Sequence, residues 1–469
     1  MARRSFMVMV MVLFAISVYA GGEVKLNVSA KYLDKGCTFQ LKGDIEGPYK
    51  WSSSNTAVAV VDTNGKVKAV APGTAIITAV ATDSSRGEAK IFVYGKGTLS
   101  NLAFPAIKSS HSNNGLDIAV DRNGILYLAK NTYDEKLAAD TKAKAMIWKY
   151  DGTWAEYGQN PLGITDDEAS TPSIAIGVKG SIYVSSLYYK DYNDLYEKNI
   201  VYSAGDKVQI LGSGKGRLMM VDGDGLYGKN VLAWEGDLFA ATVKSGNGTV
   251  HKFDQKTSQW TLVGRKIVQD DNFWAGGIDL AVENSVPYVS IRTSSGTGKI
   301  GIYYFDSISK AWKLVGNAYA TPENHDAQFQ DQVVGESPIV VTENGNILTA
   351  YRCYEDGENR IKVRMCAGVT GSWETIFSAP NKTDAKQVGL QKAGSFVYLI
   401  IAGYNMGMDI YKLNTCGKWI YEGRTEKIDT YYNFTTAAGP NGEFYIAYDC
   451  TDMKDLLSGV FKYTPYQFK

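Results

Sequence analysis

The chain has 469 residues, which is enough for two or three domains with a sizeable core. Lys and Arg together equal Asp and Glu, at 49 each, so no net charge favours binding to nucleic acid. Tyrosine is unusually frequent, with 31 residues. Its ring has a flat apolar face and a polar tip, which suits both strand surfaces and wet binding sites.

The first residues, MARRSFMVMVMVLFAISVYAGG, have a basic start, a short apolar run and small residues at the end. This layout predicts a secretory signal peptide over residues 1–20. The apolar run is shorter than the roughly 20 residues that a membrane helix requires, and no second long apolar run follows. We therefore expect a soluble, exported protein without a membrane span.

Residues 21–95 have the pattern of a small β-sandwich. Apolar residues alternate in short runs between 51 and 79, and the turn signals DTNG and APG separate these runs. The alternation predicts three consecutive antiparallel strands with one buried face. Two upstream strands and a last strand in GEAKIFVYG complete a sandwich of immunoglobulin type.

Several short motifs in this segment resemble one family. Trp51-Ser52-Ser53-Ser54-Asn55, Gly65-Lys66-Val67-Lys68-Ala69 and Gly73-Thr74-Ala75 are similar to the bacterial immunoglobulin-like group 2 module. The resemblance implies a spacer or adhesive module of an exported bacterial protein, without catalysis. It implies a location in the periplasm or at the cell surface, or outside the cell.

Residues 96–469 contain a repeat of strand, tight turn and strand, as in IAVDRNGILYLAK and TAAGPNGEFYIAY. Most units continue with a third strand and a fourth that begins at a Trp. Seven such units predict a seven-bladed β-propeller. The expected fold class is therefore all-β, a small immunoglobulin-like β-sandwich followed by the propeller. The turn residues of the units are Gly124, Gly180, Gly236, Asn284, Gly345, Gly394 and Gly442.

The seventh unit ends without a Trp-led fourth strand. TLSNLAFPAI, residues 98–107, is strand-like and has no unit of its own. We expect it to close the ring beside the C-terminal strands, because closure pairs two otherwise exposed edges. Sialidase-like propellers carry the motif Ser-x-Asp-x-Gly-x-x-Trp at the turn before the fourth strand. This chain keeps the Trp of that motif without its acidic and glycine residues, which favours a structural role for Trp260, Trp312, Trp373 and Trp419.

Loop length predicts the binding face of the propeller. The connections between first and second strands are short, whereas those between second and third strands and between units are long. Long loops on a rigid scaffold usually carry binding. The loop LYYKDYNDLYEK offers aromatic platforms with nearby carboxylates for a sugar or a peptide. The alternative is a solvated polar loop whose tyrosines cover a blade edge. Its tyrosines are Tyr188, Tyr189, Tyr192 and Tyr196.

Other candidate ligand-binding residues precede or end the inner strands. Trp274 stands just before the first strand of unit four, and Tyr431 and Tyr432 take the same place in unit seven. They form either a ligand shelf or a lid on the channel. Arg292 and Arg352 end the second strands of neighbouring units, where a pair of arginines suits a carboxylate ligand.

Metal and cofactor sites receive little support. His325 lies among acidic residues in a long loop, but the chain has only three histidines and no spaced motif. Calcium at Asp222 and Asp224 is conceivable, yet the twelve-residue spacing of a calcium loop is absent. We expect no cofactor and no metal. The five cysteines show no metal-ligand spacing, which favours isolated thiols.

Two functions remain open. The first is a non-catalytic exported protein whose propeller binds a glycan or a cell-surface protein. The second is a carbohydrate-active enzyme, a lyase or a hydrolase, with its site in the funnel. No nucleophile with a neighbouring base is evident, so catalytic residues cannot be named. Two carboxylates about 5–10 Å apart in the funnel would favour a glycosidase.

Overall fold

The computed structural model divides the described chain into two compact units, residues 22–95 with Tyr466–Phe468, and residues 96–465. The predicted signal peptide lies outside the described residues. These are 22–104, 115–132, 144–158, 168–177, 179–189, 198–204, 209–211, 217–218, 229–244, 247–268, 275–293, 299–321, 338–355, 358–380, 385–403, 407–428, 431–451 and 456–468.

The first unit is a β-sandwich of two sheets, as the alternating pattern predicts. One sheet has the order β1-β7-β6-β3 and the other β2-β5-β4. Its strands are β1 (Ala30–Asp34), β2 (Thr38–Gln40), β3 (Lys50–Ser53), β4 (Ala59–Val61), β5 (Lys66–Ala69), β6 (Gly73–Val80) and β7 (Arg86–Tyr94).

The core of the first unit lies between these sheets. Val67, Ile77 and Ile91 are fully buried there, and the Trp51 indole packs against them. The prediction of three consecutive antiparallel strands is only partly right. β4 pairs with β5, but β6 pairs with β3 and β7 in the other sheet, because the APG turn carries the chain across the core.

The last residues of the chain belong to the first unit. The Phe468 ring lies 5.8 Å from Tyr32, 5.2 Å from Phe92 and 5.1 Å from Tyr94, measured between ring centroids. Tyr32 and Phe92 stack at 4.6 Å on the paired strands β1 and β7. The tail therefore adds an aromatic side chain to a stripe that would otherwise face water.

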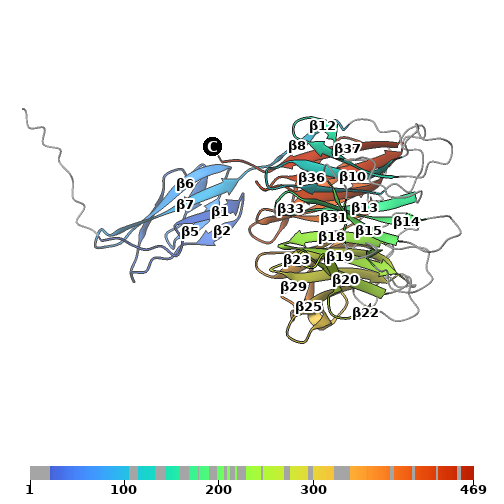
Figure 1. Ribbon diagram of the computed structural model, residues 1–469. Coiled ribbons are helices and arrows are strands. Elements are labelled where there is room, and N and C mark those ends of the chain that lie inside the picture. Colours follow the sequence, from blue (N-terminus) through green and yellow to red (C-terminus); the bar gives the residue numbers. More distant parts are fainter. Residues whose placement is uncertain are drawn as a thin grey trace, which may run out of the picture. The chain divides into compact units, whose positions relative to one another are not determined.

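The second unit consists of seven antiparallel sheets (Figure 1). The first four sheets contain β9 (Leu116–Val120), β10 (Leu126–Thr132), β11 (Lys144–Tyr150) and β12 (Trp154–Glu156); β13 (Glu168–Ile176), β14 (Ile182–Tyr189), β15 (Lys198–Ala204), β16 (Gln209–Ile210) and β17 (Arg217–Leu218); β18 (Lys229–Glu235), β19 (Asp237–Lys244), β20 (Asn247–Asp254), β21 (Gln259–Leu262) and β22 (Ile267–Val268); β23 (Ala275–Glu283), β24 (Val286–Thr293), β25 (Ile300–Asp306) and β26 (Ala311–Leu314).

The 3-10 turn η1 (Val315–Asn317) follows β26. The last three sheets contain β27 (Ile339–Val341), β28 (Asn346–Glu355), β29 (Glu358–Ala367) and β30 (Trp373–Pro380); β31 (Ala385–Ala393), β32 (Phe396–Gly403), β33 (Met408–Leu413) and β34 (Trp419–Arg424); β35 (Tyr431–Ala438), β36 (Phe444–Thr451), β37 (Leu456–Thr464) and β8 (Thr98–Asn101).

These sheets are the blades of a seven-bladed β-propeller. The first strand of each blade contacts the first strands of both neighbours, and β35 of the last blade contacts β9 of the first, so the ring is closed. β8 pairs with β37 as the outer strand of the last blade. Figure 1 shows β8 beside β37 in the upper part of the propeller.

The tight turns between first and second strands lie where the sequence predicts them. All seven predicted turn residues have positive φ, from 52° at Asn284 to 81° at Gly124. Glycine adopts this left-handed backbone without steric cost. At the fourth blade Asn284 and Ser285, both with positive φ, form the two-residue turn between β23 and β24.

The Trp residues that begin the fourth strands join neighbouring blades. The Nε1 groups of Trp154, Trp260, Trp312 and Trp373 donate to the carbonyl oxygens of Leu102, Leu211, Val263 and Val315, at 2.9–3.2 Å. Each acceptor directly follows the fourth strand of the preceding blade. These bonds support the structural role that the sequence predicts for Trp260, Trp312 and Trp373.

The cysteines differ from the expectation of isolated thiols. Cys353 and Cys366 are buried free thiols, in agreement with it. Cys37 and Cys416 are disulfide-bonded, so the expectation is wrong for these two. Spacing along the chain did not reveal that these two cysteines are oxidised, because disulfides depend on distances that only the folded chain sets.

Candidate functional site

The structure describes only part of the predicted ligand site. Tyr192, Tyr196, Trp274 and His325 lie outside the described residues. Tyr188 and Tyr189 end β14. Tyr431 and Tyr432 begin β35. For these four tyrosines the described structure gives the backbone alone. Both strand ends open onto the long connections, as the alternation of strands in a blade requires.

Arg292 and Arg352 lie on the second strands of two neighbouring blades. Arg292 pairs across the sheet with Gly277 and Ile300 and is half-buried. Arg352 pairs with Ile361 and is only 6% exposed. Both stand towards the carboxyl ends of β24 and β28, opposite the tight turns between first and second strands, and only residues 356–357 join β28 to β29. Each guanidinium therefore brings a permanent positive charge close to the loop side of the propeller.

The loop-side ends of the first strands are irregular. Strand pairing shifts register near the start of β13, β23, β31 and β35, in each case within the first few residues of the strand. A β-bulge redirects side chains and is frequent beside binding sites. The opposite ends of the same strands run into regular tight turns. The propeller therefore has one face of regular tight turns and one face at which the first strands begin irregularly.

Polar side chains on the first strands join the blades around the axis. Asp117 on β9 accepts hydrogen bonds from Ser173 Oγ and the Ile174 amide of the next blade, at 2.9 and 3.0 Å. It also accepts from Thr435 Oγ1 of the last blade, at 2.7 Å. Ser173 Oγ in turn accepts from the Leu232 amide at 3.0 Å. Asp117 thus holds the point where the ring closes.

The same arrangement recurs further around the ring. Asp279 on β23 accepts from the Ile339 amide of the next blade at 3.0 Å. Gln387 on β31 donates to the Phe434 carbonyl oxygen and accepts from the Phe434 amide, at 3.1 and 2.9 Å. Four of these residues occupy the same sequence position relative to the turn glycine of their units: Asp117, Ser173, Gln387 and Thr435.

These polar positions were missed in the sequence analysis, although a signal was present. GLDIAV and GGIDLAV place an Asp at the same point of two first strands, between apolar neighbours. A carboxylate inside a buried strand needs partners, because burying an unpaired charge is costly. Here the neighbouring blade supplies them. Asp117 and Asp279 therefore help to join neighbouring blades.

A buried ion pair joins the first and last blades near the loop side. Lys130 Nζ on β10 lies 2.6 Å from Asp449 Oδ1 on β36, and the two side chains are 0% and 2% exposed. The pair connects the second strands of the two blades that meet where the ring closes. Its burial makes it part of the ring closure.

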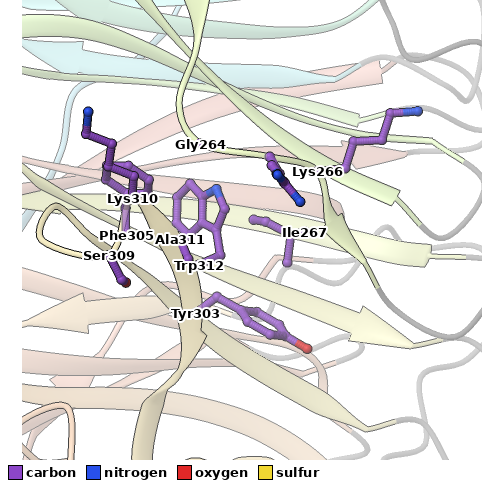
Figure 2. Close-up of a pocket in the computed structure, with 10 residues that line it drawn as sticks. Gly264, Lys266, Ile267, Tyr303, Phe305, Ser309, Lys310, Ala311 and Trp312 are labelled. Carbon is purple, nitrogen blue, oxygen red and sulfur yellow. The ribbon is translucent and has the colours of Figure 1, made fainter.

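One pocket of the described chain lies between the third and fourth blades, with a cavity volume of about 770 Å³. Figure 2 shows the Trp312 indole at its centre, with Phe305 and Tyr303 nearby. The other lining residues are Gly264, Arg265, Lys266, Ile267, Ser309, Lys310 and Ala311. This pocket was not predicted, because the sequence gives no measure of how well neighbouring blades fill the space between them.

Within the residues that the structure describes, no group of three or more His, Cys, Asp or Glu could hold a metal ion. Asp222 and Asp224, the conceivable calcium ligands, lie outside those residues. No helix in the described part of the chain is long and apolar enough to cross a membrane.

The N-terminal unit has a known relative. Residues 31–92 match the family model of the bacterial Ig-like domain (group 2). This segment is a bacterial Ig-like domain of group 2. The match falls within β1 to β7, so the family and the sandwich fold predicted from the motifs around Trp51 and Gly65 are both confirmed. No curated protein sequence matches this chain.

Solved structures resemble the chain only distantly. The polysaccharide lyase Uly1 has 14% identity and a TM-score of 0.48, with 78% of this chain and 92% of that one covered. The SapL1 lectin bound to α-methyl fucoside has 14% identity and a TM-score of 0.38, with 66% and 96% covered. The Penicillium chrysogenum α-L-arabinanase has 8% identity and a TM-score of 0.41, with 79% and 98% covered. Likeness at this level leaves the activity of this chain open.

Proposed function

We propose that this protein is an exported bacterial glycan-binding protein in which the group 2 domain is a spacer and the propeller binds the ligand through its long-loop face. The observation that carries the proposal is the difference between the two ends of the blades. Tight turns with positive φ form one end, whereas four first strands bulge at the other.

Arg292 and Arg352 give the proposed ligand its chemistry. They stand at the loop-side ends of neighbouring blades, and guanidinium groups bind carboxylates in a bidentate manner. The tyrosines at the ends of β14 and β35 would add flat faces for sugar rings. Tyr192, Tyr196, Trp274 and His325 belong to the same proposed site. An acidic glycan combines these features better than a neutral one.

Binding is favoured over catalysis by the roles of Asp117 and Asp279. Both carboxylates accept hydrogen bonds from neighbouring blades, which favours a structural role for them over that of a glycosidase pair. The alternative, a carbohydrate-active lyase or hydrolase, would have to take its acid and base from other residues. The periplasm or the cell surface is the proposed location, since group 2 domains are typical of bacterial surface proteins.

A glycan array with the mature chain, residues 21–469, tests the proposal. The same glycans are incubated with the protein and analysed for new reducing ends and for the ultraviolet absorbance of unsaturated products. Binding of a glycan class without product supports the proposal. Cleavage of any arrayed glycan would overturn it in favour of the enzyme.

A further inference from the structure

The pocket between the third and fourth blades is lined by outer strands and their connections, whereas the site proposed above lies at the ends of inner strands. Its walls come from β22 and the segment after β21 on one side, and from β25 and β26 on the other. These are outer strands and their connections. A ligand in this pocket would therefore occupy a site separate from the one proposed above.

The side chains that line this junction between blades differ from those at two other junctions of the described chain. A hydrogen bond from a Trp Nε1 to a carbonyl oxygen of the preceding blade, here called a Trp latch, bridges four junctions between blades. At the junction of the last and first blades, Phe104 fills the space beside the Trp. The Phe104 ring contacts Trp154 edge-on at 4.5 Å and Trp148 at 5.9 Å. At the junction of the fourth and fifth blades, Trp373 is itself buried at 8% exposure.

Gly264 packs closely against the next blade. Its φ is +71°, and a Cβ at this position would lie 2.7 Å from the Phe305 ring. The next two residues are Arg265 and Lys266, both exposed, where the other junction has Phe104. The aromatic side chains Phe305 and Trp312, 5.6 Å apart between centroids, consequently remain half-buried and accessible.

The charges around the pocket are all of one sign. Arg265, Lys266 and Lys310 are exposed at its rim, and none of them forms an ion pair in the described part of the chain. Figure 2 shows Lys266 and Lys310 on opposite sides of Trp312. Among the described residues, no acidic side chain lines the pocket. The nearby Asp306 already accepts hydrogen bonds from Lys313 and Ser309.

We propose that this pocket is a second glycan subsite, which binds an anionic sugar residue of a polysaccharide. The sugar ring stacks on the aromatic side chains of Trp312 and Phe305, and its acidic group faces the three cations. Aromatic faces match the apolar face of a pyranose, and cations that are close to a low-dielectric wall attract an anion more strongly than they would in bulk water. The anionic group is a carboxylate or a sulfate.

Calorimetric titration of the mature protein tests the inference with three probes: tetragalacturonate, a chondroitin sulfate tetrasaccharide and neutral maltotetraose. The first two carry carboxylate alone and sulfate with carboxylate, and therefore distinguish the two anions. We expect binding of at least one acidic probe, weakened by added salt, and none of maltotetraose. Equal binding of maltotetraose, or binding of no acidic probe, would overturn the inference.

Variants at the rim locate the bound probe. Replacing the three cations together (Arg265→Gln, Lys266→Gln and Lys310→Gln) should weaken binding at least tenfold, because charge-assisted contacts are lost. Lys256→Gln, at an exposed turn outside the pocket, is the matched control and should bind like the wild type. All variants should retain the wild-type melting temperature, since the replaced side chains are exposed.

A further variant separates this site from the long-loop face. Arg292→Lys should weaken only the part of acidic-probe binding that belongs to the long-loop face, so binding that is lost in the triple variant but kept in Arg292→Lys is assigned to the pocket. If an acidic probe is lost with Arg292→Lys but retained by the triple variant, the probe binds at the long-loop face and the pocket inference is wrong. If both variants retain full binding, the pocket inference is likewise wrong.

Discussion

The ammonium group of Lys130 lies 2.6 Å from Asp449 Oδ1, and this buried pair joins the first blade to the last. The two residues are 319 positions apart in the chain. They meet because the ring returns to its start, where β8 supplies the outer strand of the last blade. Closure therefore combines backbone pairing at the outer edge with an ion pair deep inside.

Loss of one partner of this pair should destabilise the propeller strongly. We expect Asp449→Asn or Lys130→Met to lower the free energy of unfolding by about 3–5 kcal/mol, because a buried charge is left without its counterion. The double variant Lys130→Met with Asp449→Leu should recover much of that loss. Urea unfolding provides the measurement. The exposed pair Lys252–Asp237 is the control, and Asp237→Asn should cost less than about 1 kcal/mol.

Asp117→Ala should also weaken ring closure. The substitution leaves Ser173, Thr435 and the Ile174 amide without their common acceptor. Each unsatisfied buried donor costs about 1–3 kcal/mol, so the melting temperature should fall by several degrees. Asp117→Asn, which keeps one acceptor oxygen, should cost less. An Asp117→Ala protein that melts like the wild type would contradict the proposed scaffold role.

The Trp latches can be tested with a matched pair of variants. Trp373→Phe removes the donor to the Val315 carbonyl oxygen in a buried position and should cost about 1–3 kcal/mol. Trp419 Nε1 has no hydrogen-bond partner among the residues that the structure describes. Trp419→Phe should therefore cost less than Trp373→Phe. Equal losses in chemical denaturation would show that ring packing, and not the hydrogen bond, stabilises these junctions.

The stability of the propeller should fall in mild acid because of His251. Burial lowers the pKa of this imidazole on β20 below its ordinary value of 6.5. The unfolded chain then binds the proton more tightly than the folded one, so the contribution of His251 is complete above pH 6.5 and is lost as pH falls below that value. His251→Phe should flatten the pH dependence of the melting temperature between about pH 5 and 7. If His251→Phe leaves the slope of melting temperature against pH unchanged, His251 does not cause the loss of stability in mild acid.

Ligand binding at the long-loop face should depend on Arg292. Once the array identifies an acidic glycan, Arg292→Lys should weaken its binding about 5- to 150-fold, because lysine keeps the charge but loses bidentate geometry. Lys179→Ala, at an exposed turn of the opposite face, should have no effect. Equal affinity of Arg292→Lys and wild type, measured by titration, would exclude Arg292 from the site.

Local patterns were sufficient to predict the architecture. Alternating apolar residues and turn signals predict strands, and the left-handed backbone that glycine permits predicts where the hairpins turn. Gly124 and Gly442, far apart in the sequence, therefore have the same φ to within a degree, 81° and 80°. Motifs around Trp51 also identified the group 2 domain, because its turn residues recur at fixed spacings.

Contacts between blades could not be predicted in this way. Three contacts join residues of different blades: Asp117 with Thr435, Lys130 with Asp449, and Gly264 with Phe305. Nothing in the local sequence indicates that the two residues of each pair lie close together. Backbone conformation is set by neighbours along the chain, so hairpins can be predicted from the sequence. The partner of a buried charge and the space between two blades depend on packing across the ring, which exists only after the chain has closed on itself.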